Sequence, residues 1–213
     1  MAEIDTRPMT VSPVTLTGAV VRLEPLSQDH LPGLIAVGLD PVLWRWVPTQ
    51  VTTPDEMRAY VHTALEERDR HVSLPFAIVH KASAQVIGST RYGNIDRANR
   101  RVEIGWTWVA RSHQRTGANT DAKRLLLTHA FEVLGAHRVE LKTDALNQQS
   151  RAAIARIGAT QEGIFRSHVV VPARVGPEGE TIPARLRDSV YFSIIAAEWP
   201  AVKERLAALA RPD

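Results

Sequence analysis

The short segment from Gln114 to Asn119 carries the residue types that point most clearly to chemistry. It stands between a strand-like run and a helix-like run, so it forms the turn at which a helix begins. The first backbone N–H groups of a helix have no partner inside the helix, and the helix dipole favours negative charge there. Gly117 lets the backbone approach a ligand closely, and Arg115 and Lys123 add positive charge. The segment therefore predicts a binding site for a phosphorylated ligand.

Two widespread phosphate motifs are absent from the sequence. Neither Gly-x-x-x-x-Gly-Lys-Ser/Thr nor Gly-x-Gly-x-x-Gly occurs, so neither a nucleoside-triphosphate loop nor a dinucleotide fingerprint is indicated. An ordinary strand-to-helix turn, which often contains glycine, stays open as the alternative.

Two periodic runs must position this turn. The run Arg101–Val109 alternates like a half-buried strand, whereas Thr120 to Leu134 carries apolar residues at helical spacing. On one face of the strand we expect Val102, Ile104, Trp106 and Trp108, and on the other Glu103, Gly105 and Thr107.

The remaining periodic runs predict an alternation of strands and helices. Strands are expected at 16–26, 74–80, 86–96, 101–109, 138–143, 159–171 and 187–195, and helices at 27–39, 53–70, 120–134, 147–157 and 199–210. Strands 86–96 and 101–109 form a predicted hairpin. Hairpins mixed with helical crossovers predict an α/β or α+β fold, in which a mixed sheet has helices on both faces.

The 213 residues predict one domain at 16–213, preceded by a loose N-terminal segment at 1–15. The absence of cysteine excludes disulfides, thiolate metal sites and a cysteine nucleophile, and it fits the cytoplasm. Neither a secretory signal nor an apolar stretch approaching the ~20 residues of a membrane span stands out, so no membrane partner is expected.

The distribution of charge and histidine narrows the partners. Lys and Arg (26) exceed Asp and Glu (23) by three, and the basic residues are scattered, so no nucleic acid partner is expected. A mildly positive surface suits a small anionic ligand. The eight histidines show no metal-ligand spacing, so no metal is expected.

The chain resembles the GNAT superfamily of acyl-CoA-dependent N-acetyltransferases. That family's phosphate loop reads Gln/Arg-x-x-Gly-x-Gly/Ala; here Gln114 and Gly117 match, and Asn119 departs by its larger side chain. A later family element, an Asn that begins a helix ending at Gly, is matched from Asn147 to Gly158. The chain further resembles the branch of the ribosomal-protein alanine N-acetyltransferases (RimJ/RimL-like). This resemblance lies in Glu103-Ile104-Gly105-Trp106 and in Gly158-Ala159 with Glu162-Gly163. The resemblance covers about Val20 to Ile195.

The resemblance implies the acyl-CoA N-acyltransferase fold, with a mostly antiparallel sheet whose fourth and fifth core strands splay apart. Acetyl-CoA is the implied acyl-donor cosubstrate, bound in that cleft without a metal. Its pyrophosphate would lie on backbone N–H groups of the turn, and its pantetheine arm beside the strand and the later helix. The implied binding residues are Trp108, Val109, Gln114, Arg115, Thr116, Gly117, Ala118, Asn119, Thr120, Asn147 and Ser150.

The resemblance also suggests how protons move. Glu103 is the candidate base, acting through a water, and its alternative is a structural hydrogen bond or an ion pair with Arg101 or a neighbouring arginine. Many relatives protonate the thiolate with a Tyr seven positions after the helix-starting Asn, where this chain has Ile154. Ser150 is the best substitute, although a first-turn hydroxyl can equally contact the cofactor or backbone. A thiol of pKa ~8.5 also leaves tolerably without an acid.

Three tryptophans are candidate substrate contacts. Trp44 and Trp46 lie in the connection that would cover the acceptor cleft, and Trp106 projects from the central strand. They could form a stacking wall for an aromatic acceptor or simply pack in the core or at its rim.

The resemblance thus implies acetyl transfer to a primary amine, and a protein N-terminus is the first acceptor hypothesis. The alternatives are a small amine (a toxin, an antibiotic or an aminoacyl-nucleotide) and a catalytically silent CoA-binding regulator, which Ile154 and Asn119 motivate. The expected oligomeric state is a monomer or a homodimer.

Overall fold

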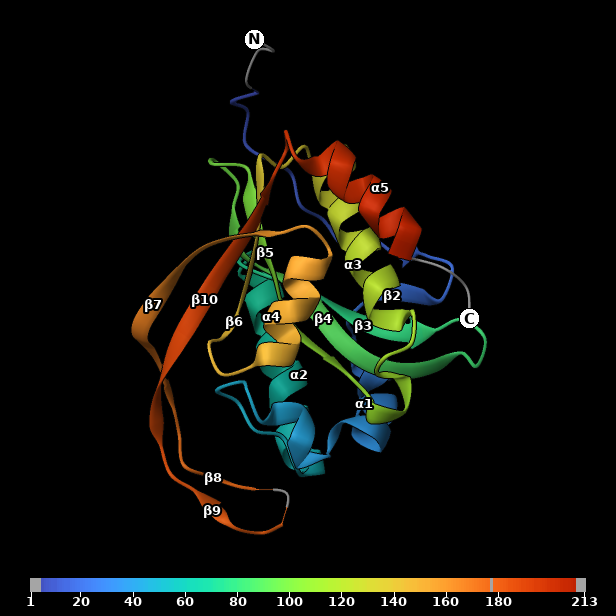
Figure 1. Cartoon of the computed structure of the whole chain (residues 1–213). Coiled ribbons are helices and arrows are strands. Elements are labelled where there is room, and N and C mark those ends of the chain that lie inside the picture. Colours follow the sequence, from blue (N-terminus) through green and yellow to red (C-terminus); the bar gives the residue numbers. More distant parts are fainter. Residues whose placement is uncertain (1–4, 177, 210–213) are drawn as a thin grey trace.

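The computed structural model describes residues 5–176 and 178–209. Its centre is an eight-stranded sheet in the order β1-β2-β3-β4-β5-β6-β10-β7, accompanied by a two-stranded β8-β9 piece (Figure 1). The strands are β1 (Leu16–Thr17), β2 (Val21–Pro25), β3 (Leu74–His80), β4 (Gln85–Asp96), β5 (Arg101–Val109), β6 (Arg138–Asp144), β7 (Thr160–Val171), β8 (Arg174–Val175), β9 (Thr181–Ile182) and β10 (Arg185–Ile195). Every neighbouring pair is antiparallel except β5 and β6, so the expected mixed, mostly antiparallel sheet is confirmed.

Helices cover both faces of this sheet, also as expected. They are α1 (Leu31–Gly38), α2 (Pro54–Asp69), α3 (Ala118–Thr128), α4 (Gln148–Arg156) and α5 (Trp199–Leu209). Helices α1 and α2 pack on one face through residues such as Leu34 and Met57. Helices α3, α4 and α5 share the other face, where Leu126, Ile154 and Leu206 join one buried cluster. We call these the α2 face and the α3 face.

The helix starts follow from local sequence. Thr53 precedes α2 and its hydroxyl accepts from the Glu56 N–H, while the Glu56 carboxylate accepts from the Thr53 N–H, which makes a capping box. Asn147 caps α4 by accepting from the Ser150 N–H at 3.0 Å. Helix α3 begins at Ala118, slightly before the expected Thr120, and continues after Thr128 as one π-helical turn, His129–Val133.

The alternation expected along β5 is wrong beyond Gly105. The pairing with β4 jumps from Gly105 opposite Arg91 to Trp108 opposite Ser89, and Trp106 has φ +49°. One extra residue on β5 is a β-bulge, which reverses the faces of all later side chains. Ile104 therefore packs on the α3 face, whereas Trp108 joins the buried cluster of the α2 face.

The parallel strands β5 and β6 separate soon after they begin. Only Arg101–Glu103 of β5 pair with Arg138–Glu140 of β6, although β5 continues to Val109 and β6 to Asp144. This confirms the expected splay and leaves a gap between the two strands, at the end of which the 114–119 turn begins α3.

The strands β7 and β10 form a long hairpin whose far end bends toward the connection between α1 and α2 (Figure 1). The guanidinium of Arg174, in β8, donates to the Trp44 carbonyl at 2.7 Å, and Gln50 donates through Nε2 to the Val175 carbonyl at 2.7 Å. The end of the hairpin is thus tied to the α1–α2 connection by hydrogen bonds to backbone carbonyls.

The N-terminal segment contacts the sheet from Asp5 onward, and residues 1–4 lie outside the described part of the chain. Met9 is 1% exposed and its N–H donates to the Arg97 carbonyl at 2.9 Å. Arg100 donates to the Arg7 carbonyl and pairs with Asp5. The C-terminal residues 210–213 also lie outside it. None of the helices described is long and apolar enough to cross a membrane.

Candidate active site

The turn before α3 is held by its own side chains. Gln114 donates through Nε2 to the Val109 carbonyl at 3.0 Å, which closes the turn against the end of β5. The Thr116 hydroxyl donates to the His113 carbonyl and accepts from the Ala118 N–H. Arg115 adopts φ +63°, whereas Gly117 has φ −64°, a value open to any residue. The expected role of Gly117 is therefore one of space, since an added Cβ would lie 3.3 Å from Val20.

The backbone of this turn presents a row of donors. Within residues 5–176 and 178–209, the N–H groups of Arg115, Thr116, Gly117, Asn119 and Thr120 have no hydrogen-bond acceptor. An N–H row of this kind at a helix N-terminus binds anions, because the donors point outward and the dipole attracts negative charge. The turn can therefore hold a diphosphate.

A buried carboxylate, which sequence reasoning missed, fixes the start of α3 to the sheet. Asp121 accepts from the N–H groups of Val20 and Val21 at 2.8 and 3.0 Å, and pairs with Arg124 at 2.8 Å. Burial acts to raise the pKa of Asp121, but the Val21, Arg124 and Val20 hydrogen bonds outweigh it and the pKa is lowered. Gly18 leaves room, because its Cβ would fall on this carboxylate. The sequence signal that could have identified Asp121 is its position as an acidic residue in the first turn of a helix, where negative charge is stabilising.

Glu103 is 2% exposed and faces away from α3. Its Oε2 atom accepts from Asn94 Nδ2 at 2.7 Å and from the ammonium of Lys142 at 2.9 Å. The ion pair is thus made with a lysine of β6, whereas Arg101 pairs with Asp96 and Glu140. No donor among the described residues reaches Oε1. Glu103 therefore keeps one carboxylate oxygen available to a water or an amine.

The other residues that the sequence suggested for the site lie near the start of α4. The side chain of Asn147 is engaged in capping, and Ser150 lies half-buried in the first turn. Ile154 is buried in the cluster of the α3 face, so the chain has an apolar core side chain where many relatives have Tyr. Helix α4 approaches α3 where Arg156 donates to the Thr120 hydroxyl at 3.4 Å.

The tryptophans expected at the acceptor site have different environments. Trp44 is 2% exposed, packs against Tyr60 and Trp108 with ring centroids 5.4 and 5.5 Å apart, and donates to the Gly38 carbonyl. Trp46 is half-buried beneath the guanidinium of Arg45. Trp106 is 37% exposed. Of the three, Trp106 is thus the most accessible and Trp44 is a core residue.

Cationic groups surround the ring of Trp106. Arg91 lies 5.2 Å from the ring centroid and Lys142 lies 5.8 Å from it. Because Lys142 also pairs with Glu103, the aromatic ring, the ammonium and the carboxylate form one contiguous group on the α2 face.

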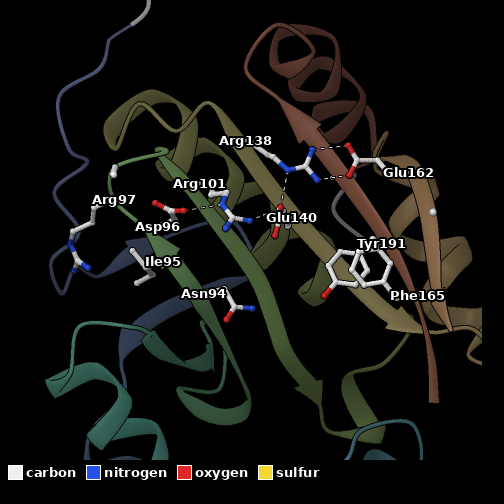
Figure 2. A pocket seen from close by; sticks show the side chains of 12 residues that line it. Asn94, Ile95, Asp96, Arg97, Arg101, Arg138, Glu140, Glu162, Phe165 and Tyr191 are labelled. Atoms are coloured by element: carbon white, nitrogen blue, oxygen red, sulfur yellow. Dashed lines mark hydrogen bonds and ion pairs between the residues drawn. The ribbon is translucent and has the colours of Figure 1, made fainter. Parts of the chain in front are cut away.

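A cavity of about 820 Å³ opens beside this group, lined by β4, β5, β6, β7 and β10 (Figure 2). Asn94 belongs both to its lining and to the hydrogen-bonding partners of Glu103. Figure 2 shows Tyr191 and Phe165 together on one side, with ring centroids 4.4 Å apart. Ion pairs of Arg101 and Arg138 with acidic side chains line the other part, so charges of both signs face the space.

Lys123 does not reach the anion-binding turn, contrary to the sequence expectation. Its ammonium donates to the hydroxyl of Thr107 at 2.9 Å, on the α3 face of β5. Thr107 reaches that face only because the bulge at Trp106 reverses the alternation. Burial lowers the pKa of Lys123 to about 7, partly opposed by the charge of Glu103. Among the described residues no cluster of acidic and histidine side chains is arranged to hold a metal ion.

Comparison with known proteins identifies the family. Residues 21–160 match the family described as the acetyltransferase (GNAT) domain. Over 110 residues the chain is 36% identical to a Bacillus subtilis protein named "Putative ribosomal N-acetyltransferase YdaF"; the match spans 52% of this chain and 54% of that protein. The chain thus spans about half the length of this curated relative.

Two solved structures are similar over almost the whole chain. A GCN5-related N-acetyltransferase from Brucella melitensis has a TM-score of 0.85 and 33% identity, covering 98% of this chain and 90% of its own. Mycobacterium smegmatis RimJ, solved in complex with CoA-disulfide, has a TM-score of 0.74 and 25% identity, covering 93% and 96%. These findings confirm the resemblance noted in the sequence: the chain belongs to the GNAT family of acetyltransferases.

Proposed function

We propose that this protein transfers the acetyl group of acetyl-CoA to a primary amine, and that the amine is the N-terminus of a protein. The observation that carries the proposal is the row of N–H groups at residues 115–117, 119 and 120, which have no acceptor in the described part of the chain. It stands at the end of the gap between β5 and β6. An anion site and an open strand edge are the two features that a diphosphate joined to a pantetheine arm requires.

The residues present fit acetyl-CoA as a cosubstrate. The N–H row would hold the pyrophosphate, with the exposed Arg115 adding charge. The edge of β5 that β6 leaves unpaired would receive the pantetheine arm near Trp108 and Val109. Bound acetyl-CoA supplies a thioester carbonyl that an amine can attack directly. The protein's contribution is then chiefly to hold two reactants in line.

Glu103 is the proposed base. The attacking nitrogen must lose a proton, and a buried carboxylate with one free oxygen can take it directly or through a water. Oε2 is engaged by Asn94 and Lys142, so Oε1 is the proposed accepting atom. An α-amine, with a pKa near ~8, is partly neutral at pH 7, whereas an alkyl amine near ~10.4 is mostly protonated. This difference favours a chain terminus over a lysine side chain.

The cavity beside Glu103 is the proposed entrance for the acceptor. Its lining combines an aromatic pair, the amide of Asn94 and ion pairs of both signs. Such a surface offers donors and acceptors to an extended peptide, whereas a strongly charged small molecule would call for one sign of charge. The name of the B. subtilis relative, which refers to ribosomal acetylation, supports the same class of acceptor.

The test is thiol release from acetyl-CoA with peptides, matched N-terminally blocked peptides and small amines. We expect turnover with free peptide N-termini and none with the blocked peptides, even when these contain lysine. In parallel, mass spectrometry of a lysate with and without the enzyme identifies N-termini that gain 42 Da, the mass of an acetyl group in place of hydrogen. Turnover confined to small amines would contradict the acceptor class. CoA binding without any thiol release would favour the silent regulator.

A further inference from the structure

Lys123 lies on the side of α3 that contacts β5, and its partner Thr107 belongs to the part of β5 that does not pair with β6. Thr120 and Lys123 are three residues apart in the helix and therefore lie on the same side, one turn from each other. Thr120 contacts Arg156 of α4, and Lys123 contacts Thr107 of β5. The two contacts therefore join this side of α3 to β5 and to α4, the helix that follows β6 in the chain. On the other side of α3, Asp121 contacts β2.

The ammonium of Lys123 is enclosed but incompletely bonded. The residue is 9% exposed, and of its three possible donor bonds only that to the Thr107 hydroxyl is made within the described residues. The Thr107 hydroxyl is in turn 2.7 Å from that of Thr90. Within the described residues no carboxylate pairs with this ammonium, and a lysine buried without such a partner is costly, which calls for a role beside β5.

The charged groups around Lys123 come from each neighbouring element. Glu103 of β5 acts on it electrostatically, and that carboxylate is itself paired with Lys142 of β6. Arg156 of α4 lies one turn away, against Thr120. Asp121, on its own helix, is already paired with Arg124. None of these groups makes an ion pair with Lys123, so burial dominates and its pKa is lowered to about 7.

We propose that Lys123 donates the proton to the coenzyme A thiolate when the thioester breaks. In the step, the C–N bond forms, the C–S bond breaks, and the sulfur takes the electron pair and the proton of the Lys123 ammonium. The amine proton passes to Glu103, and exchange with solvent returns one proton to Lys123. The proposal rests on acetyl transfer from acetyl-CoA, proposed above, and not on the class of the acceptor.

Acid strength explains why a buried lysine suits this task. The free thiol has a pKa near ~8.5, so an ordinary lysine at ~10.4 would hold its proton more tightly than the thiolate. Because burial lowers the pKa of Lys123 to about 7, its ammonium is a stronger acid than the thiol, and transfer of its proton to sulfur is downhill. Lys123 thus acts as the proton donor for which Ile154 has no suitable group. Ser150 then serves only to contact the cofactor or the backbone.

The first test measures the titration of Lys123 directly. The sequence contains four lysines, Lys81, Lys123, Lys142 and Lys203, so lysine labelled with ¹³C at Cε gives four NMR signals. We expect one signal to titrate near pH 7 and to vanish in Lys123→Gln. Saturating CoA should shift that midpoint, because a sulfur close to the amine exchanges a proton with it, and CoA lacking its sulfur atom should not. An equal response to both ligands would show that the sulfur is not close and would overturn the proposal.

The second test is kinetic. Lys123→Gln should lower kcat about 100-fold with acetyl-CoA but only slightly with the acetyl selenoester, whose leaving group needs no proton. Lys123→Arg should behave like Lys123→Gln, since a guanidinium above pKa ~12 is too weak an acid. The control is Lys203→Gln, the same change at an exposed lysine of α5.

The thioester and selenoester assays are each run with an amine acceptor and also without one, in which case water hydrolyses the ester. An incorrect acceptor class then does not obscure the result. Rates retained in Lys123→Arg would indicate a role for charge alone and contradict proton donation. Equal losses with thioester and selenoester would contradict it as well. If a variant unfolds, as circular dichroism would reveal, the NMR response of the native protein decides.

Discussion

Oε1 of Glu103 lies 2.9 Å from the position that a Cβ atom on Gly105 would occupy. The two residues are separated by one position on β5, directly before the bulge at Trp106. The missing side chain of Gly105 therefore leaves space beside the oxygen that has no donor among the described residues. This relationship explains why a glycine stands in the middle of a central strand, where it otherwise weakens the structure.

Gly105→Ala should consequently impair catalysis more than folding. The methyl group would displace Oε1, and we expect kcat to fall about tenfold while the affinity for CoA is kept. In a Glu103→Gln background the same change should cost little more, since the two substitutions remove one function. Additive losses in this double-variant cycle, measured by thiol release, would show that Gly105 acts elsewhere.

Glu103→Gln tests the base itself. Glutamine preserves the side-chain shape and can still accept from Asn94, but it cannot take a proton. We expect kcat to fall by about 10²-fold and the low-pH limb of the pH–rate profile, which reports the base, to disappear. Lys142→Met is the companion variant: it removes the ion-pair partner, keeps the carboxylate and should therefore retain that limb. An unchanged profile in Glu103→Gln excludes Glu103.

Asp121→Asn should destabilise the protein in a pH-dependent way. The lowered pKa of Asp121 means that its carboxylate stabilises the fold above the unfolded value near ~3.9, and that this contribution is lost as pH falls through the folded pKa. Loss of charge-assisted hydrogen bonds to Val20 and Val21 should cost about 2 kcal/mol at pH 7 in urea unfolding.

The matched control for Asp121→Asn is Asp55→Asn. Asp55 is also a first-turn acid with an arginine three residues later, but it is 91% exposed. That change should cost no more than a few tenths of a kcal/mol. Equal effects at the two sites, or a difference between native and Asp121→Asn protein that persists unchanged at low pH, would refute the assigned role.

Gly117→Val should weaken CoA binding. A Cβ at this position already lies 3.3 Å from the Val20 side chain, and a β-branched residue would push the turn away and misalign its N–H groups. We expect the Kd for CoA, measured by calorimetry, to rise at least about tenfold, which is ~1.4 kcal/mol. Adding Val20→Ala should recover part of the affinity by relieving the contact. An unaltered Kd in Gly117→Val counts against the turn as the diphosphate site.

Arg174→Ala should affect the binding of the acceptor and not the binding of CoA. Its guanidinium is buried and donates to the carbonyls of Trp44 and Pro48, and its burial lowers its pKa. Its loss would free the end of the β7–β10 hairpin, so we expect KM for the acceptor to rise severalfold while the Kd for CoA is unchanged. Arg166→Ala, at an exposed arginine of the same hairpin, is the control. A loss of CoA affinity would mean that the hairpin does not act on the acceptor alone.

Much of the candidate site could be predicted because its signals are local. The turn at 114–119, the capping of α2 and α4 and the strand character of β5 all depend on residues within one or two turns of each other. Glu103 is the proposed base because of the family resemblance and its place on β5. The bulge was missed because the dihedral of a single residue, Trp106, gives no periodic signal, and this one residue misplaced both Trp108 and Thr107.

The sequence by itself determined the order of the main elements, the turn that begins α3 and the family, since periodicity, caps and motif spacing are properties of neighbouring residues. Only the tertiary structure decided which side chains meet. Lys142 reaches Glu103 across 39 positions, Asp121 reaches Val20 across 101, and Arg174 reaches Trp44 across 130. The physical reason is that packing, burial and the separation of β5 from β6 set these contacts, and with them the burial that lowers the pKa of Lys123.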